Sequence, residues 1–168
     1  MAEPLRPNLS LLLSSPTLFL ALGAGAGLAP YAPGTAGSLL AVPLVLLLQT
    51  LPFQAQIAIW MLMTGAGIWI CDRAGRTLGD PDHPAIVWDE ICGTAIVLLL
   101  APLGPAWLFM GFVAFRVFDI AKPWPINIVD RRFANGAGAM GDDLLAAVYA
   151  IAAISLLHLL TRTVLGID

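Results

Sequence analysis

The sequence predicts an all-α, polytopic helical membrane protein that forms a single domain over residues 1–168. Hydrophobic residues make up 59% of the chain and charged residues 11%, and the mean hydropathy is +0.87. A soluble domain carries about 25% charged residues, so this composition excludes an ordinary soluble fold. A membrane-spanning helix needs about 20 apolar residues, which leaves room for about four or five crossings.

The charge and the cysteines limit the possible partners. The net charge is only −3 and no basic run occurs, which excludes a nucleic-acid partner and leaves membrane lipids as the expected surroundings. Cys71 and Cys92 lie far apart without CxxC spacing, so we interpret them as free thiols of a reducing compartment. Nothing in the sequence specifies an oligomeric state.

The N-terminal half contains one interrupted apolar segment and one hairpin. Residues 9–29 are apolar but carry Pro16 and several Gly and Ser residues, so they either cross the membrane or lie partly in its interface. Residues 38–51 and 55–71 are two apolar helical runs joined by Pro-Phe-Gln. Because this joint carries no charge, the two runs predict a transmembrane hairpin.

The C-terminal half is predicted to hold a second, shallower hairpin and a last helix. Residues 72–90 are polar and contain Gly and Pro, which indicates a loop outside the membrane. Residues 91–115 are apolar, but Ala-Pro-Leu-Gly-Pro at 101–105 breaks them into two pieces too short to span. We therefore expect a half-depth hairpin. A charged stretch at 116–143 follows, and residues 144–161 form the last apolar helix.

The polar loops at 30–38, 72–90 and 116–143 are predicted to lie on one face. They can meet only if an even number of crossings separates them, and the full hairpin and the half-depth hairpin both satisfy this condition. The turns of the two hairpins carry no Lys or Arg, whereas the polar loops and their edges carry Arg73, Arg76, Arg116, Lys122, Arg131 and Arg132. The positive-inside rule then predicts that the loop face is cytoplasmic.

Carboxyl groups gather where these loops join apolar helices: Asp89, Glu90, Asp119, Asp142 and Asp143. If the loops meet, the negative charges repel one another unless a cation lies between them. Oxygen ligands favour Mg²⁺ before Ca²⁺, and the near absence of His and Cys argues against zinc. The sequence therefore predicts a Mg²⁺ site. For any single acid at a helix start, stabilisation by the helix dipole is an equally good explanation.

Basic and hydroxyl side chains beside the acids indicate a phosphate site. Arg116 and Asp119 share one helical face, and Lys122 follows one turn later. A fixed cation beside a metal-binding carboxylate neutralises phosphoryl oxygens, so the pattern fits phosphoryl transfer at a membrane surface. Thr35 and Ser38 lie in Pro-Gly-Thr-Ala-Gly-Ser directly before a predicted helix, whose N-terminus can hold a phosphate. A role of Ser38 as a simple N-cap explains that residue as well.

Four motifs carry a family resemblance: PYAPGTAGSLLA at 30–41, DHPAIVWDEICG at 82–93, FRVFDIAKPWPI at 115–126 and GAGAMGDDLLAA at 136–147. In this order the sequence resembles the phosphatidylglycerophosphatase A family of bacterial membrane phosphatases. The resemblance implies Mg²⁺-dependent hydrolysis of phosphatidylglycerol phosphate to phosphatidylglycerol and inorganic phosphate, in phosphatidylglycerol and cardiolipin biosynthesis. It also implies a multi-pass protein of the bacterial inner membrane whose active site faces the cytoplasm.

The resemblance also implies that the residues of these motifs form the active site. Our hypothesis is that Asp89, Glu90, Asp119, Asp142 and Asp143 are metal ligands and that one of them is the general base for the attacking water. The catalytic set is Asp89, Asp119, Lys122 and Arg116, and the phosphate is bound by Thr35, Ser38, Arg116 and Lys122. No DxDxT motif is present, which favours direct attack by water over a covalent intermediate.

Two other functions compete with this reading. A small membrane transporter or channel also uses intramembrane acids, but here the acids lie at loop junctions and the spans carry hardly any charge. A CDP-alcohol phosphotransferase would need a long Asp and Gly array on adjacent helices, which this sequence lacks.

Overall fold

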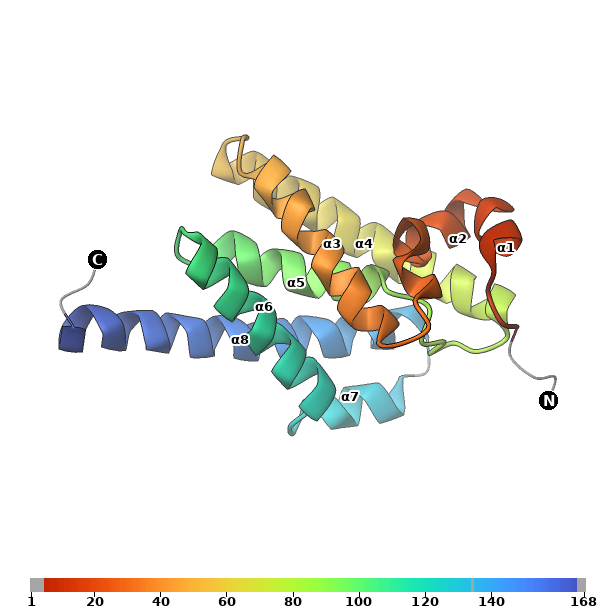
Figure 1. Ribbon diagram of the computed structural model, residues 1–168. Coiled ribbons are helices and arrows are strands. Elements are labelled where there is room, and N and C mark those ends of the chain that lie inside the picture. Colours follow the sequence, from red (N-terminus) through yellow and green to blue (C-terminus); the bar gives the residue numbers. More distant parts are fainter. Residues whose placement is uncertain (1–4, 134, 166–168) are drawn as a thin grey trace.

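The structure is a computed structural model that describes residues 5–133 and 135–165, and the described residues contain helices and no strand (Figure 1). The predicted all-α class is therefore confirmed. The elements in chain order are α1 (Leu9–Leu13), α2 (Pro16–Ala21), the 3₁₀ helix η1 (Gly23–Leu28), α3 (Pro33–Leu48), α4 (Phe53–Leu78), α5 (Trp88–Leu100), α6 (Pro105–Ala121), α7 (Ile126–Arg132) and α8 (Gly136–Leu165).

Helix α5 lies at the centre of the bundle and packs against α3, α4, α6 and α8 (Figure 1). Every residue from 91 to 99 is buried. A helix that is apolar on all sides is expected to be surrounded by other elements in this way. Its N-terminal turn carries Asp89 and Glu90, so the central position of α5 brings these two acids into the middle of the molecule.

Both predicted helix pairs form hairpins, but in the first pair only α4 is long enough to be a candidate membrane span, since α3 has 16 residues. Helices α3 and α4 are joined at 49–52, and α5 and α6 are joined at 101–104, where Gly104 has a φ of 124° that favours glycine. Helices α5 and α6 have 13 and 17 residues, so they extend about 20 and 26 Å at 1.5 Å per residue. Each is shorter than the roughly 30 Å hydrocarbon core, as expected for a half-depth hairpin.

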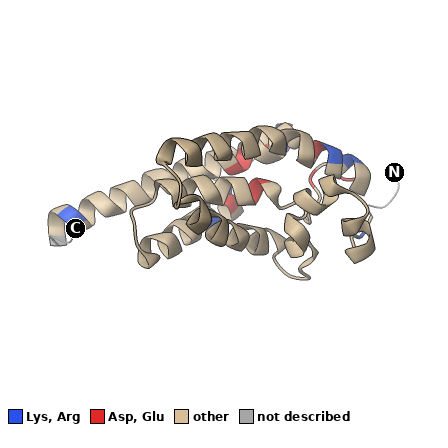
Figure 2. Ribbon diagram, turned by 90° about the horizontal axis from the view of Figure 1, so that it is seen from above, with Lys and Arg blue, Asp and Glu red and all other residues tan. Residues whose placement is uncertain are grey.

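Two helices are long and apolar enough to cross a membrane: α4, with 26 residues, and the 29 residues Gly136–Val164 of α8. Only 17% and 22% of their most apolar windows are buried inside the protein. The core helix of a soluble protein would bury most of such a surface, so these helices direct apolar side chains outward. Figure 2 shows that α8 carries almost no charge along its C-terminal part, where Arg162 is the first charged residue after Asp143.

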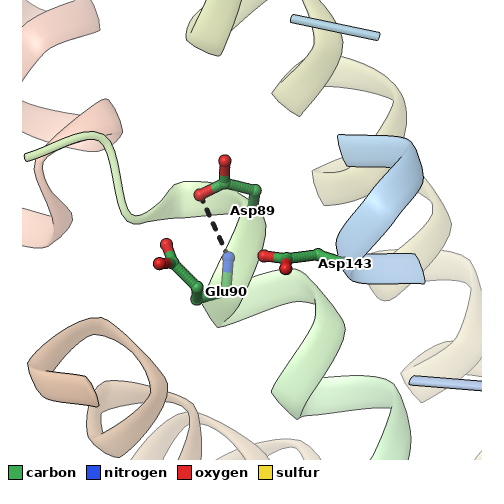
Figure 3. Close-up of side chains that lie close together, drawn as sticks. All are labelled: Asp89, Glu90 and Asp143. Atoms are coloured by element: carbon green, nitrogen blue, oxygen red, sulfur yellow. Dashed lines mark hydrogen bonds between the residues drawn. The ribbon is translucent and has the colours of Figure 1, made fainter. Parts of the chain in front are cut away.

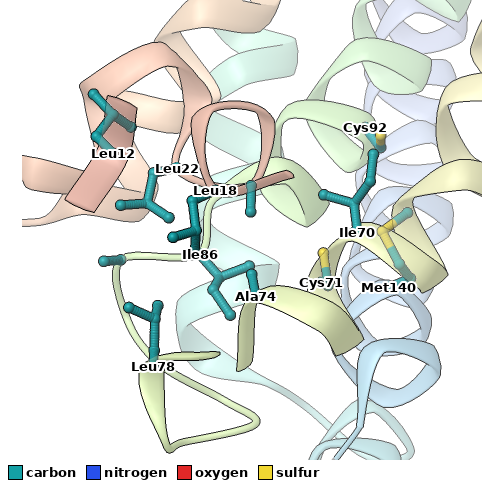
Figure 4. Close-up of a cluster of buried hydrophobic side chains, with 12 residues drawn as sticks. Leu12, Leu18, Leu22, Ile70, Cys71, Ala74, Leu78, Ile86, Cys92 and Met140 are labelled. Carbon is teal, nitrogen blue, oxygen red and sulfur yellow. The ribbon is translucent and has the colours of Figure 1, made fainter. Parts of the chain in front are cut away.

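Residues 9–29 do not form a membrane-crossing helix. Helices α1, α2 and η1 have only five or six residues each, and Ala24 and Gly25 have positive φ values of 51° and 113° that interrupt any continuous helix. The segment instead folds back onto α4, where Leu12, Leu18 and Leu22 join one buried cluster (Figure 4). The possibility that this segment spans the membrane as one helix is therefore wrong, and burial against α4 is the physical reason.

The same cluster contains both cysteines. Cys71 of α4 and Cys92 of α5 are buried among leucine and isoleucine side chains, and both are free (Figure 4). Burial in apolar surroundings makes a thiol unreactive. The interpretation of the cysteines as structural thiols thus agrees with their positions.

Three predicted boundaries are wrong, because glycine-rich stretches that resemble loops are helical. Helix α3 begins at Pro33, so Ser38 lies in its second turn and is not an N-cap. Helix α4 continues to Leu78, which shortens the predicted loop at 72–90 to residues 79–87. Helix α8 begins at Gly136, so Asp142 and Asp143 lie in its second turn instead of opening it.

Close packing explains why the start of α8 is helical in spite of its glycines. A methyl group at Gly136 would overlap the backbone carbonyl of Ile68 in α4, and one at Gly138 would overlap the carbonyl of Phe133. The Asn135 side chain accepts a hydrogen bond from the Gly138 N–H at 3.0 Å, as an N-cap does. Since the cap and the packing stabilise this turn, the dipole explanation for Asp142 and Asp143 no longer applies.

Candidate active site

All five predicted acids line one small cavity of about 80 Å³, which we call the acidic cavity. Helix α5 contributes Asp89 and Glu90, helix α6 contributes Asp119, and helix α8 contributes Asp142 and Asp143. Lys122 and the loop residues Asp82 and His83 complete its polar lining. Segments that are far apart in the sequence therefore meet here, as predicted for the three polar loops.

Three of the acids form a group that can hold a cation. One carboxylate oxygen from each of Asp89, Glu90 and Asp143 lies within 4.8 Å of the others (Figure 3). Asp89 and Asp143 are buried, with 8% and 4% of their surfaces exposed, and Glu90 is half-buried. The Glu90 N–H donates a hydrogen bond to Asp89 Oδ1 at 3.1 Å, which orients one of the three carboxylates (Figure 3).

The electrostatics of this group favour a bound cation. Burial raises the pKa of Asp89 to about 6. Burial also raises the pKa of Glu90 well above its ordinary value, and the neighbouring Asp89 charge raises it further. Glu90 Oε2 is buried and has no hydrogen-bond partner among the described residues. Three carboxylates that lack enough donors are the hard oxygen ligands that Mg²⁺ and Ca²⁺ prefer, so the donor set fits such an ion.

Arg116 connects three helices at the edge of the acidic cavity. Its Nη1 lies 2.5 Å from Asp119 Oδ2 in the same helix and 4.0 Å from Glu90 Oε1 of α5. It also donates to Ser38 Oγ of α3 at 3.4 Å. The guanidinium thus neutralises part of the acidic group, and it is held by contacts from three directions.

The first turn of α3 approaches this arginine closely. A methyl group at Gly34 would overlap the Glu90 carboxylate and would lie 3.3 Å from Arg116 Nη1. Ser38 is fully buried one turn further along. Thr35 is half-buried between them, and its hydroxyl makes no hydrogen bond to another described residue. The Pro-Gly-Thr-Ala-Gly-Ser motif therefore lies at the site, although it forms the helix itself and not the loop before it.

Lys122 lines the acidic cavity itself. It forms ion pairs with Asp130 of α7 and, at 2.5 Å, with Asp142 of α8. It has a φ of 39° and caps the C-terminus of α6, where the following Pro123 disfavours right-handed helical geometry. Burial lowers the pKa of the ammonium group, but the two carboxylates outweigh this effect and raise it overall. Lys122 is therefore a permanent cation.

The five acids thus divide into two kinds. Asp89, Glu90 and Asp143 face one another without a bonded cation within 3 Å among the described residues. Asp119 pairs with Arg116, and Asp142 pairs with Lys122. The geometry therefore favours Asp89, Glu90 and Asp143 as metal ligands over the other two acids, because those two already have a basic partner.

Three residues at the site have no role in the sequence analysis: Asp82, His83 and Asp130. Asp130 pairs with Lys122, and its only signal in the sequence is its place in the charged stretch at 116–143. Asp82 and His83 line the acidic cavity, and their signal is their place in the motif at 82–93. In all three cases the contact depends on a turn that the sequence pattern does not specify.

Comparison with known proteins identifies the family. The profile of the family described as Phosphatidylglycerophosphatase A matches residues 19–158. A protein of Escherichia coli (strain K12) named Phosphatidylglycerophosphatase A is 42% identical over 137 residues, which cover 81% of this chain and 80% of that protein. A Haemophilus influenzae protein with the same name is 43% identical over 141 residues, which cover 83% of this chain and 86% of that protein.

A third relative has a different name. A protein of Bacteroides thetaiotaomicron, provisionally named a phosphatidylinositol-3-phosphatase, is 38% identical over 146 residues that cover 82% of this chain and 91% of that protein. No solved structure matches the chain. The matched region contains every residue of the acidic cavity. The chain belongs to the phosphatidylglycerophosphatase A family.

Proposed function

We propose that the protein hydrolyses the terminal phosphomonoester of phosphatidylglycerol phosphate, with Mg²⁺ as its cofactor, to give phosphatidylglycerol and inorganic phosphate. This places it in the phospholipid biosynthesis that leads to phosphatidylglycerol and cardiolipin. Family membership supports the reaction. The observation that carries the mechanism is the buried group of Asp89, Glu90 and Asp143, with carboxylate oxygens within 4.8 Å of one another beside Arg116.

The metal is assigned to that group. Asp89, Glu90 and Asp143 supply the ligands, and Asp119 and Asp142 border the same cavity as further candidates. Bound Mg²⁺ supplies a Lewis acid that polarises the phosphoryl group and draws charge from its oxygens. The choice of Mg²⁺ over zinc follows from an all-oxygen donor set.

The basic and hydroxyl residues hold the phosphate. Arg116 pairs with Asp119 and Lys122 pairs with Asp142, two acids that line the acidic cavity. These two fixed cations favour the charge that develops on the phosphoryl oxygens. Ser38 is fully buried and accepts a hydrogen bond from Arg116 through Oγ, so it supports the phosphate site by holding the guanidinium in place. Thr35 offers a hydroxyl one turn earlier.

The reaction is a direct displacement by water. The water oxygen forms a bond to phosphorus while the ester P–O bond breaks, and one carboxylate of the cavity takes the proton that the water loses. The released glycerol oxygen gains a proton and stays with the lipid. All five acids line the cavity and are candidates for this base, and of the five Asp119 and Asp142 already pair with a basic residue.

The same reasoning extends to location. We infer that α4 and α8 cross the bacterial inner membrane and that the acidic cavity opens at the cytoplasmic side. Support comes from the two apolar helices and from the exposed Arg73, Arg76, Arg131 and Arg132, which lie in the polar segments around the cavity. A lipid substrate reaches such a site from the membrane surface.

The test is phosphate release from phosphatidylglycerol phosphate by the purified protein in detergent. We expect release with Mg²⁺, none with EDTA, and recovery when Mg²⁺ is restored. Asp143→Asn should lower kcat at least about 100-fold, because it removes a ligand from the group. Asp72→Asn, which removes an acid on α4 outside the acidic cavity, is the matched control and should keep its activity. Phosphate release that continues in the presence of EDTA, or full activity of the Asp143→Asn variant, would overturn the metal-assisted mechanism.

A further inference from the structure

A second cavity, of about 450 Å³, adjoins the acidic cavity and shares His83 and Pro84 with it. We call it the Arg6 groove. Its walls are the N-terminal segment at Arg6, the connection from η1 to α3, and the turn at 83–85. A molecule whose reacting end lies in the acidic cavity can therefore continue past His83 into this groove.

The walls of the Arg6 groove are fixed to the rest of the fold. The Leu5 N–H donates to the Leu78 carbonyl at 2.8 Å, which attaches the segment that carries Arg6 to the end of α4. On the opposite wall, a methyl group at Gly27 would overlap the Ala85 carbonyl, so η1 and the 83–85 turn are in direct backbone contact. Backbone contacts therefore hold two of the segments that form the groove against the rest of the fold.

His83 presents a hydrogen-bond donor at the boundary of the two cavities. The Ala85 N–H donates to His83 Nδ1 at 3.1 Å, and the Ile86 N–H donates to the His83 carbonyl at 2.8 Å. An Nδ1 that accepts a hydrogen bond carries no proton, so the proton of the neutral ring is on Nε2. The turn therefore fixes both the position of the ring and the tautomer, and it leaves an Nε2–H donor that the proposed hydrolysis does not use.

The charge of the Arg6 groove is opposite to that of the acidic cavity. Among the described residues that line it, Arg6 and His83 carry the only ionisable or polar side chains, and the others are Pro, Gly, Ala and Leu. Arg6 is exposed and forms no ion pair with a described carboxylate. The described lining of the groove thus offers two donor side chains and no acceptor side chain, which favours an anion. The acidic cavity instead favours a cation, together with the phosphate that binds to that cation.

We propose that the Arg6 groove binds the phosphodiester and glycerol of the lipid headgroup, an inference that rests on the proposed function. Phosphatidylglycerol phosphate carries two phosphates joined through one glycerol, and the two adjoining cavities match this order. The terminal phosphomonoester lies in the acidic cavity. At the boundary of the two cavities, His83 Nε2–H donates a hydrogen bond to an oxygen of the glycerol-phosphate unit. In the groove, Arg6 neutralises the charge of the phosphodiester. The groove would thereby select a lipid with a second phosphate over one without it.

The test separates the two halves of the headgroup by inhibition. Glycerophosphoglycerol contains the phosphodiester without the phosphomonoester, and inorganic phosphate represents the other half. In assays of phosphatidylglycerol phosphate hydrolysis, Arg6→Gln should raise the inhibition constant of glycerophosphoglycerol about tenfold and leave that of inorganic phosphate unchanged. Arg132→Gln, which removes an exposed charge on α7 outside the groove, is the matched control and should change neither constant.

Two variants of His83 test the donor itself. His83→Asn keeps an acceptor near the Nδ1 position for the Ala85 N–H but loses the Nε2–H donor, so it should weaken glycerophosphoglycerol inhibition about tenfold. His83→Gln places an amide N–H near the Nε2 position and should restore part of that loss. Equal inhibition in active wild type, Arg6→Gln and His83→Asn would overturn this inference alone. A wild-type protein that releases no phosphate would overturn the proposed function together with it.

Discussion

Ser38 of α3 and Arg116 of α6 are 78 residues apart in the sequence and meet in the fold, with Arg116 Nη1 3.4 Å from Ser38 Oγ. Ser38 is fully buried, so its hydroxyl has no access to solvent. This contact joins the hydroxyl motif to the basic residue of a different motif. It is therefore the point at which the proposed phosphate site is assembled.

Ser38→Ala is predicted to reduce catalysis more than stability. The substitution removes a partner that positions Arg116 for the phosphate, so we expect kcat/KM to fall about tenfold. The free energy of unfolding should change by only about 1 kcal/mol, because one hydrogen bond is lost and no large cavity forms. Steady-state kinetics and thermal unfolding of the same preparation measure both effects. Equal kinetics in wild type and Ser38→Ala would show that the contact has no role in the reaction.

Gly34→Ala is predicted to disturb the site without unfolding the protein. The added methyl group would overlap the Glu90 carboxylate, which is the end of a flexible side chain and moves at little cost. Activity should fall at least about tenfold through the displaced ligand, while the unfolding temperature stays nearly constant. Gly136→Ala is the contrasting variant, because its methyl group would meet the rigid backbone of α4. It should lose about 1–3 kcal/mol of stability, and the reverse pattern in the two variants would contradict this assignment.

Asp130→Asn is predicted to have a moderate effect on the reaction. Lys122 loses one carboxylate partner and keeps Asp142, so it stays at the acidic cavity with a lower pKa than in the wild type. We expect kcat/KM to fall about three- to tenfold, far less than for removal of Lys122 itself. Kinetics of Asp130→Asn and Lys122→Met under the same conditions provide the comparison. A loss in Asp130→Asn as large as that in Lys122→Met would mean that Asp130 contacts the substrate directly.

The metal-free protein is predicted to lose stability as the pH rises. The folded-state pKa of Asp89 is about 6, above the value of 3.8 for a free aspartate, and that of Glu90 is also raised. A raised carboxyl pKa means that the folded state holds the proton more tightly than the unfolded state does. The stabilisation that results from this difference is complete below about pH 4 and is lost as the pH rises through about 6. For Asp89 this amounts to a free energy on the order of 3 kcal/mol.

Thermal unfolding in detergent with EDTA, followed by tryptophan fluorescence, measures this dependence. We expect the unfolding temperature to fall between about pH 4 and pH 7, and Mg²⁺ to raise it again at the higher pH, because a ligand that binds only the folded state stabilises it. Asp72→Asn should show the same profile as the wild type, since Asp72 lies outside the acidic cavity. A profile that is flat with EDTA would contradict the presence of buried, unneutralised acids.

The predicted beginnings of α3 and α8 are wrong for one physical reason. Glycine lowers helix propensity, so the glycine-rich stretches around Gly34 and Gly136 predict loops when they are considered locally. In the folded protein these glycines lie where another chain segment approaches too closely for a side chain, and tertiary packing outweighs the local preference. As a result Ser38, Asp142 and Asp143 project from helices at fixed positions and not from flexible loops.

What the sequence determined by itself is the class of the protein and the inventory of its site. Composition and apolar runs specify an all-α membrane protein with two hairpins, because the length and polarity of a segment alone decide whether it can enter a membrane. The four motifs identify the family and all five acids. Only the tertiary structure decided that Asp89, Glu90 and Asp143 face one another while Asp119 and Asp142 pair with basic residues. Those partnerships depend on how α5, α6 and α8 pack, and a one-dimensional pattern does not contain the rotation of one helix against another.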